Sequence, residues 1–340
     1  MRPSREPLTS AYDVAMLDLD GVVYIGPHAV PGAREHLERA AAQGLHLAYV
    51  TNNASRTPDT VAAHLRRLGI PVEDADVVTS AQAAARLLAD RLEEGAPVFV
   101  IGGEGLEVAL AEQGLKPVQE RDADPRAVVS GYSGELRWST VVAGALLVRD
   151  GLPWVASNTD MTVPTPDGAG PGNGALVGVV ARFAGREPVV AGKPEPPLFE
   201  ETLRRVGGTR PLVVGDRLDT DIEGANRTGY DSLLVMTGVT GVAELVGAPA
   251  RQRPTYVAAD LGALSRPYQP PEVADERVTC GGWQATVADG VVGADGAGEP
   301  DEWWRAVAAA GWRHLDTTGS PPDVTRLVPP SSVGRDPRRR

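Results

Sequence analysis

The chain is poor in cysteine, in lysine and in long apolar runs, and each shortage excludes a class of protein. Its one cysteine, Cys280, cannot form a disulfide within the chain, and no histidine and cysteine cluster has the spacing of a zinc site. No stretch approaches the roughly 18 apolar residues of a membrane-spanning helix, and the first residues lack the apolar core of a secretory signal. We therefore expect a protein of the reducing cytoplasm.

The charge balance is acidic, and this narrows the choice of partner. The chain carries 33 lysines and arginines against 45 aspartates and glutamates, which gives a formal net charge of −12. Nucleic acid and anionic membranes are bound by positive surfaces, so we expect neither as a partner and favour a small molecule. Lysine occurs only at Lys116 and Lys193, so a lysine in a conspicuous motif is of interest.

The order of apolar segments predicts an α/β fold. With 42% hydrophobic and 23% charged residues, the 340-residue chain has the composition of a globular protein of about two or three domains. Short runs rich in valine and leucine alternate with amphipathic stretches of helical length, which is typical of a parallel, Rossmann-like sheet. Strands are predicted at 14–18, 45–50, 97–101, 127–129, 154–156, 189–190, 212–215 and 232–236.

Two segments interrupt this alternation. Residues 157–175 are crowded with Gly, Pro, Thr and Asp, which predicts a long loop. After the proline-rich segment 266–272, the pattern changes to a hairpin and a tryptophan-bearing helix near 302–310. The hairpin has one arm over 278–287, a turn near Asp289-Gly290 and a second arm at 291–292. We therefore expect a small α+β appendage at the C-terminal end.

Polar motifs follow four of the predicted strands. They are Asp18-Leu19-Asp20-Gly21, Thr51-Asn52-Asn53, Gly192-Lys193-Pro194 and the segment from Gly215-Asp216 to Asp221. Each motif alone would fit an ordinary turn or helix cap. Ligands of open parallel sheets bind beyond the carboxyl ends of the strands, however, and four motifs at such ends favour one shared site.

The residue types in these motifs indicate a chemistry. They provide at least three carboxylates, a hydroxyl with adjacent backbone amides, and one ammonium group. Clustered carboxylates repel one another unless a hard cation lies between them, and oxygen ligands of this kind suit Mg²⁺. Once the metal and the ammonium neutralise a phosphate, a carboxylate can attack its phosphorus. The motifs thus predict phosphoryl transfer through an aspartyl phosphate.

In this order the motifs resemble those of the haloacid dehalogenase superfamily, in its phosphatase branch with a large C2-type α/β cap (class IIA). The resemblance spans about residues 14–261. This chain has Val22 where many members of the superfamily have Thr, but valine is common at that position in the capped branch. The segments that carry it are DLDGVVYIG, VTNNASRT, SNTD with PTPDGAGPGNGA, AGKPEPPLF and VGDRLDTDIEGANRTG. It implies a Rossmann-like hydrolase core at 10–80 and 186–265, an inserted cap for substrate selectivity at 81–185, an appendage at 272–330 and a disordered tail at 331–340.

The resemblance also implies a role for each acidic residue of the motifs. Asp18 matches the nucleophile and a magnesium ligand. Asp20 matches the general acid and base, and its backbone carbonyl would face the metal. Asp216 matches a further magnesium ligand, and Asp221 matches the acid that orients a metal-bound water.

The remaining motif residues match groups that hold the substrate. The resemblance implies that the phosphate is bound by Thr51, Asn52, Asn53 and Lys193. Asn158 and Asp160 match a substrate loop near the entrance of the site, although an ordinary Asx and glycine loop would have the same sequence.

The substrate follows only from the resemblance. A capped phosphatase with a short appendage is similar to the bacterial glycerol 3-phosphate phosphatases, whose tail resembles a fragment of an acetyltransferase, which implies hydrolysis of glycerol 3-phosphate in glycerophospholipid recycling. The tail lacks the acyl-CoA loop pattern, so acetyl transfer is not expected. The alternatives are a nucleotide or broad sugar-phosphate phosphatase, a phosphomutase and a non-catalytic binding module. We also expect a homo-oligomer through the cap or the appendage, in which the tail's tryptophans form either a core or a docking face.

Overall fold

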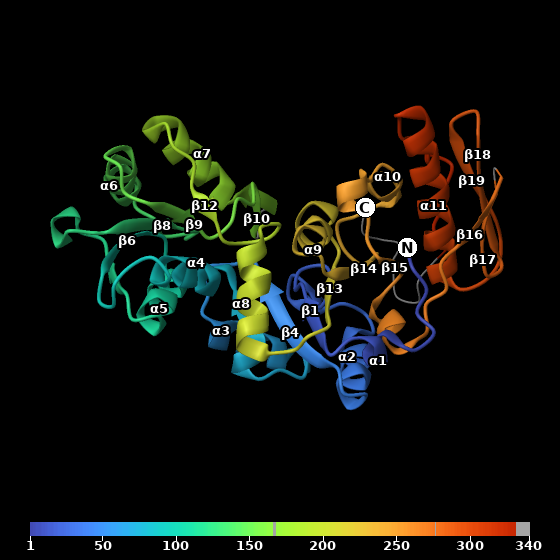
Figure 1. Cartoon of the computed structure of the whole chain (residues 1–340), viewed down its shortest axis with the longest axis horizontal. Coiled ribbons are helices and arrows are strands. Elements are labelled where there is room, and N and C mark those ends of the chain that lie inside the picture. Colours follow the sequence, from blue (N-terminus) through green and yellow to red (C-terminus); the bar gives the residue numbers. More distant parts are fainter. Residues whose placement is uncertain (166–167, 276, 331–340) are drawn as a thin grey trace. The chain divides into compact units, whose positions relative to one another are not determined.

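The computed structural model describes residues 1–165, 168–275 and 277–330. The predicted disordered tail, 331–340, lies outside the described residues. The chain divides into two compact units: the first contains Met1–Leu47, Leu68–Pro71 and the residues from Gly208 on, and the second contains Ala48–Arg67 and Val72–Gly207 (Figure 1). Residues 10–80 and 186–265, the predicted hydrolase core, are therefore shared between the two units.

The first unit contains a parallel sheet covered by helices. Its helices and strands before the C-terminal part are α1 (Leu8–Ala11), β1 (Val14–Leu17), β2 (Tyr24–Ile25), β3 (His28–Ala29), α2 (Ala33–Ala42), β13 (Pro211–Gly215), α9 (Glu223–Thr228), β14 (Asp231–Val235), α10 (Val242–Val246) and β15 (Tyr256–Ala258). The parallel strands pair in the order β15-β14-β13-β1. Strands β1 and β13 are buried along their whole length, which explains their unbroken apolar sequences. The predicted parallel α/β fold is confirmed here.

The C-terminal part of this unit is an antiparallel sheet with one long helix. Its elements are β16 (Glu272–Ala274), β17 (Arg277–Cys280), β18 (Trp283–Ala288), β19 (Val291–Gly296) and α11 (Pro300–Thr318). The expected appendage is present (Figure 1), and its hairpin turn near Asp289-Gly290 is confirmed by the pairing of β18 with β19. The expected unbroken arm over 278–287 is wrong, because it is divided into β17 and β18. The chain turns at Gly281, whose φ is 51°, and a Cβ on Gly282 would lie 1.9 Å from the Ala297 carbonyl oxygen.

The appendage shares its interior with the parallel sheet. Trp303, Trp304 and Trp312 of α11 are buried in one apolar cluster with residues of β14, α10 and β15. Trp312 Nε1 donates to the Leu245 carbonyl (2.6 Å), and Arg305 Nε donates to the Val257 carbonyl (3.2 Å). These three tryptophans therefore form core rather than a docking face.

The second unit contains a parallel sheet of its own. Strand β4 (His46–Thr51) begins in the first unit and ends in the second, where it pairs in parallel with β5 (Val77–Thr79). A separate five-stranded parallel sheet of this unit has the strand order β12-β9-β8-β6-β7 and does not include β4 or β5. The elements are α3 (Pro58–Arg67), α4 (Ser80–Ala89), β6 (Pro97–Ile101), α5 (Glu104–Glu112), β7 (Lys116–Val118), β8 (Ala127–Ser130), α6 (Trp138–Arg149), β9 (Trp154–Ala156), β10 (Thr162–Thr165), β11 (Gly168–Pro171), α7 (Asn173–Ala184), β12 (Val189–Val190) and α8 (Pro196–Val206).

The described residues of the segment 157–175 include regular secondary structure. The long loop expected there contains the antiparallel pair β10 and β11, and α7 begins at Asn173. Gly172 and Gly174 permit this, because a Cβ at either position would lie 2.3 Å from a backbone carbonyl oxygen of residues 159–160. No helix in the described part of the chain is long and apolar enough to cross a membrane.

Candidate active site

Three carboxylates converge in the first unit. Asp18 follows β1, where its N–H donates to the Val214 carbonyl (2.8 Å) and so extends the pairing with β13. Asp216 follows β13, and Asp221 lies in a π-helical turn just after it. One oxygen from each carboxylate lies within 4.8 Å of the other two. Asp221, for which the family resemblance implies an indirect role through water, is thus part of the same group as Asp18 and Asp216, for which it implies a role as ligands.

The group is buried and acidic, which makes it suitable for a hard cation. Asp216 is 0% exposed and Asp221 is 1% exposed, while Asp18 is partly exposed. Three carboxylates at this separation repel one another strongly in a buried site, and a divalent cation removes the repulsion. A donor set made only of carboxylate oxygens is the set that Mg²⁺ prefers, so these residues fit that ion.

Backbone contacts hold Asp216 and Asp221 in fixed orientations. Val239 N–H donates to Asp216 Oδ2 (2.6 Å), and Arg217 N–H donates to Asp221 Oδ2 (3.1 Å). Each carboxylate is thus ordered in the folded chain, so that binding of a cation does not have to order a mobile side chain.

Two glycines allow the backbone to approach Asp216. A Cβ on Gly21 would lie 2.4 Å from Asp216 Oδ2, and a Cβ on Gly238 would lie 1.9 Å from the same oxygen. Gly21 also has a φ of 85°, which is unfavourable for other residues. Thr237 Oγ1 donates to the Gly21 carbonyl (2.6 Å) and links the two loops. The glycine after the two aspartates is therefore required by contact as well as by the turn.

Asp20 lies beside this group in the sequence but in a different environment. Leu19 is buried, whereas Asp18 is partly exposed and Asp20 is exposed. Gly21 N–H donates to the Tyr24 carbonyl (2.8 Å), which closes the turn that carries Asp20. An exposed carboxyl is accessible to a substrate and to water, as a general acid and base must be. The predicted approach of its backbone carbonyl to a metal stays a prediction.

The predicted phosphate-binding residues gather in the second unit. Thr51 ends β4 and is buried, and its Oγ1 accepts from Asn53 N–H (3.1 Å). The Asn53 side chain turns back on its own loop, where its Oδ1 accepts from Ser55 N–H (2.9 Å) and Arg56 N–H (3.2 Å). Asn53 therefore shapes the loop after the strand with its side chain.

Lys193 is held at the same place by Asn52. Asn52 Oδ1 accepts from Lys193 N–H (2.8 Å), and Asn52 Nδ2 donates to the Lys193 carbonyl (3.0 Å). Lys193 is only 4% exposed, and its Nζ lies 3.4 Å from the Val50 carbonyl oxygen. A Cβ on Gly192 would lie 2.5 Å from Asn52 Oδ1, so the Gly-Lys-Pro motif needs its glycine.

The loop after β9 joins this group. Asn158 Nδ2 donates to the Asn52 carbonyl (2.7 Å), and Asn52 Nδ2 donates to both carboxylate oxygens of Asp160 (3.1 and 3.2 Å). Buried Ser80, the first residue of α4, also donates to the Asn52 carbonyl (2.6 Å). The sequence interpretation missed Ser80 and the Asn52 side chain. Ser80 follows β5, a strand that the sequence analysis did not predict, and nothing local indicated the contacts of the Asn52 side chain.

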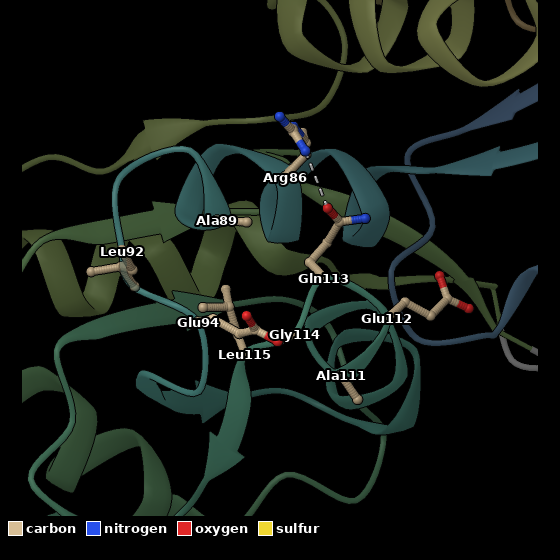
Figure 2. Close-up of a pocket in the computed structure, with 9 residues that line it drawn as sticks. All are labelled: Arg86, Ala89, Leu92, Glu94, Ala111, Glu112, Gln113, Gly114 and Leu115. Carbon is tan, nitrogen blue, oxygen red and sulfur yellow. Dashed lines mark hydrogen bonds between the residues drawn. The ribbon is translucent and has the colours of Figure 1, made fainter.

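A hollow elsewhere in the second unit contains none of these residues. It has a volume of about 510 Å³ and lies at the ends of α4 and α5 (Figure 2). Arg86 Nη1 donates to Gln113 Oε1 (3.5 Å) across it, and the Glu112 carboxylate lies at its border. The hollow therefore belongs neither to the acidic group of the first unit nor to the Asn52 and Lys193 group of the second.

The comparisons with known proteins agree with the motifs. A model described as haloacid dehalogenase-like hydrolase matches residues 15–116, and a HAD-hydrolase-like model matches residues 190–264. The first span contains the motifs at Asp18 and Thr51, and the second contains those at Lys193 and Asp216.

Several relatives have phosphatase names. A D-glycerol 3-phosphate phosphatase of Mycobacterium tuberculosis is 43% identical over 314 residues, which are 90% of this chain and 87% of that protein. An acid sugar phosphatase of Staphylococcus aureus is 35% identical over 252 residues, covering 74% of this chain and 95% of that protein.

Solved structures show the same relationship. A crystal structure of a glycerol phosphate phosphatase from Mycobacterium tuberculosis in complex with magnesium has a TM-score of 0.81 and 41% identity, covering 91% of this chain and 92% of that chain. The sequence resemblance is thus confirmed: this chain belongs to the haloacid dehalogenase-like hydrolases and shares the architecture of the capped phosphatases among them.

Proposed function

We propose that the protein is a magnesium-dependent phosphoric monoester hydrolase that converts glycerol 3-phosphate to glycerol and phosphate. The observation that carries the chemistry is the convergence of Asp18, Asp216 and Asp221 within 4.8 Å of one another. The substrate is supported by the relative named D-glycerol 3-phosphate phosphatase, whose similarity covers 90% of the chain and so extends into the appendage. Such an enzyme would act in the recycling of glycerophospholipid head groups in the cytoplasm.

The acidic group would hold the cation. Asp18 and Asp216 are the proposed carboxylate ligands, and Asp221 would bind the ion directly or through a water molecule. When bound, Mg²⁺ would neutralise the carboxylates and polarise a phosphoryl oxygen of the substrate. A carboxylate of Asp18 can then approach a phosphate that would otherwise repel it.

Asp18 and Asp20 would divide the reaction into two steps. In the first, a carboxylate oxygen of Asp18 forms a bond to phosphorus, the ester P–O bond breaks, and Asp20 gives its proton to the leaving alkoxide. In the second, Asp20 takes a proton from water, which attacks the phosphorus of the aspartyl phosphate and releases inorganic phosphate and the Asp18 carboxylate. The exposed position of Asp20 supports its contact with both water and the leaving group.

The second group would bind the phosphate. We propose that the Thr51 hydroxyl, the Lys193 ammonium and the backbone amides of Asn52 and Asn53 hold the transferring phosphoryl group. The burial of Lys193 supports this, because a fixed positive charge has a larger effect on a phosphate where water is excluded.

The domain division into a core, a cap at 81–185 and an appendage at 272–330 remains part of this proposal.

A substrate panel tests the proposal. We expect phosphate release from glycerol 3-phosphate with Mg²⁺ present and none with excess EDTA, because the acidic group repels phosphate without a cation. The values of kcat/KM for glycerol 3-phosphate, UMP and a hexose phosphate would be measured side by side. A ranking led by UMP would reject the substrate, transfer to a second site on the sugar would indicate a mutase, and no release from any ester would indicate a binding module.

The second candidate is a broad sugar-phosphate phosphatase with the same residues. The observation that favours it is the 35% identical relative named acid sugar phosphatase, whose similarity covers 74% of this chain. In that case the panel would show comparable kcat/KM values for the hexose phosphate and for glycerol 3-phosphate.

We also propose that two copies associate through the cap. The helices α6 and α7 pack together and expose large apolar side chains, with Trp138 65% and Phe183 53% exposed, whereas three of the appendage's tryptophans are buried. Light scattering after gel filtration should give the mass of a dimer for the wild type. The double variant Trp138→Glu and Phe183→Glu should have the mass of a monomer, because it replaces exposed apolar side chains with charged ones. A monomeric wild type would exclude the association.

A further inference from the structure

We propose that Asp160 is a positioning residue, which holds Lys193 in place through the side-chain amide of Asn52. The inference rests on the proposed function, in which Lys193 binds the phosphate. In this role the loop after β9 does not touch the phosphate itself but sets the position of the group that does.

The amide of Asn52 is fully used by two neighbours. Its oxygen accepts from Lys193 N–H at 2.8 Å, and one of its N–H groups donates to the Lys193 carbonyl at 3.0 Å. The other N–H is shared between the two carboxylate oxygens of Asp160 at 3.1 and 3.2 Å. One side chain thus holds both polar backbone groups of Lys193 and one carboxylate.

Asp160 reinforces the orientation of this amide. An amide turned by 180° would place its oxygen against the Asp160 carboxylate and the Lys193 carbonyl, and its NH₂ group against Lys193 N–H. All three contacts would then be repulsive, so the carboxylate and the Lys193 backbone favour the same orientation. An alanine at position 160 removes the one charge-assisted contact among the three and weakens the hold of the amide on Lys193.

The loop that carries Asp160 is itself fixed. Asp160 N–H donates to Asn158 Oδ1 (3.1 Å), and the Asp160 carbonyl accepts from Gly174 N–H (2.9 Å) in the first turn of α7. Asn173 Nδ2 donates to the Asn158 carbonyl (2.7 Å). None of these contacts uses the carboxylate of Asp160. They therefore persist in a variant that removes only this carboxylate.

The consequence for Lys193 is a loss of precision rather than of charge. Its ammonium lies at the end of a flexible side chain whose backbone is held by Asn52, and displacements of about 1 Å can reduce catalysis by up to about 100-fold. The acidic group belongs to the first unit, so its affinity for Mg²⁺ should not depend on Asp160.

The test compares Asp160→Ala and Asp160→Asn with the control Asp150→Ala. Asp150 lies in the same unit, is exposed and pairs with Arg149 (2.8 Å), so the control removes the same charge away from the site. With Mg²⁺ present, we expect Asp160→Ala to raise the Kd for inorganic phosphate about 10-fold and to lower kcat/KM by about 10- to 100-fold. Asp160→Asn keeps one acceptor oxygen and should fall between Asp160→Ala and the wild type, and Asp150→Ala should match the wild type.

Two further readouts separate positioning from a loss of structure. The Mg²⁺ concentration for half-maximal activity and the thermal midpoint should stay close to wild type in Asp160→Asn, although its phosphate affinity falls. Wild-type phosphate affinity in both Asp160 variants would overturn the inference, as would equal losses of phosphate affinity, Mg²⁺ affinity and stability. A wild type that neither hydrolyses esters nor binds phosphate would instead overturn the proposed function.

Discussion

Asp18→Asn is expected to lower kcat for phosphate release by at least about 10⁴-fold, the largest effect of any single substitution in this chain. An amide oxygen does not attack phosphorus, and the substitution also removes one of the three carboxylates that converge on the proposed cation. Steady-state phosphate release, measured with saturating Mg²⁺ and glycerol 3-phosphate, would detect the loss.

A matched control lies at the opposite end of the same strand. Asp13 precedes β1, and its carboxylate accepts from Thr209 N–H (3.0 Å) and Arg210 N–H (2.8 Å). We expect Asp13→Asn to keep kcat within about 2-fold of wild type, since this carboxylate binds only backbone and hydroxyl groups of the chain. If Asp18→Asn retained more than a few per cent of activity, another group would have to be the nucleophile.

Lys193→Met is expected to lower kcat/KM by about 10³-fold. The substitution keeps most of the apolar volume of the side chain but removes a positive charge that is 4% exposed, where its effect on the phosphate is greatest. Lys193→Arg should restore only part of the activity, because a buried site shaped for a compact ammonium does not fit the wide guanidinium group.

The chain contains a control for this experiment in its other lysine. Lys116 is exposed at the start of β7, so Lys116→Met removes the same charge with the same change of side chain. We expect its kcat/KM to equal that of the wild type. A Lys193→Met variant within 10-fold of the wild type would remove Lys193 from the proposed phosphate site.

The strands and the acidic group could be predicted from local sequence. In a parallel sheet, an apolar run followed by a polar motif places that motif at the carboxyl edge, and Asp18 and Asp216 obey this rule directly. Asp221 is five residues further on, and a one-turn helix is sufficient to bring it back to the other two. The acidic group therefore depends on short segments whose conformation the sequence indicates.

The contacts of Asn52 could not be predicted in this way. Its partners lie in segments that follow it by 28 to 141 residues, and each contact depends on how the loops pack against one another. A sequence pattern shows that Asp160 follows a strand but not which amide its carboxylate meets. The break in the strand at Gly281 could not be predicted for a similar reason. It depends on a distant contact, because the side chain of Glu302 in α11 occupies the place where a Cβ on Gly281 would lie.

The interior shared by α11 and the parallel sheet limits how this polypeptide can be trimmed. A fragment ending before residue 272 would expose Val257 and Leu245 to solvent, and the Ala259 N–H would lose the Asp301 oxygen that accepts from it at 2.7 Å. Removal of all residues from 272 on would thus leave an exposed apolar surface that favours aggregation. A truncated form of the protein therefore needs polar substitutions along strand β15.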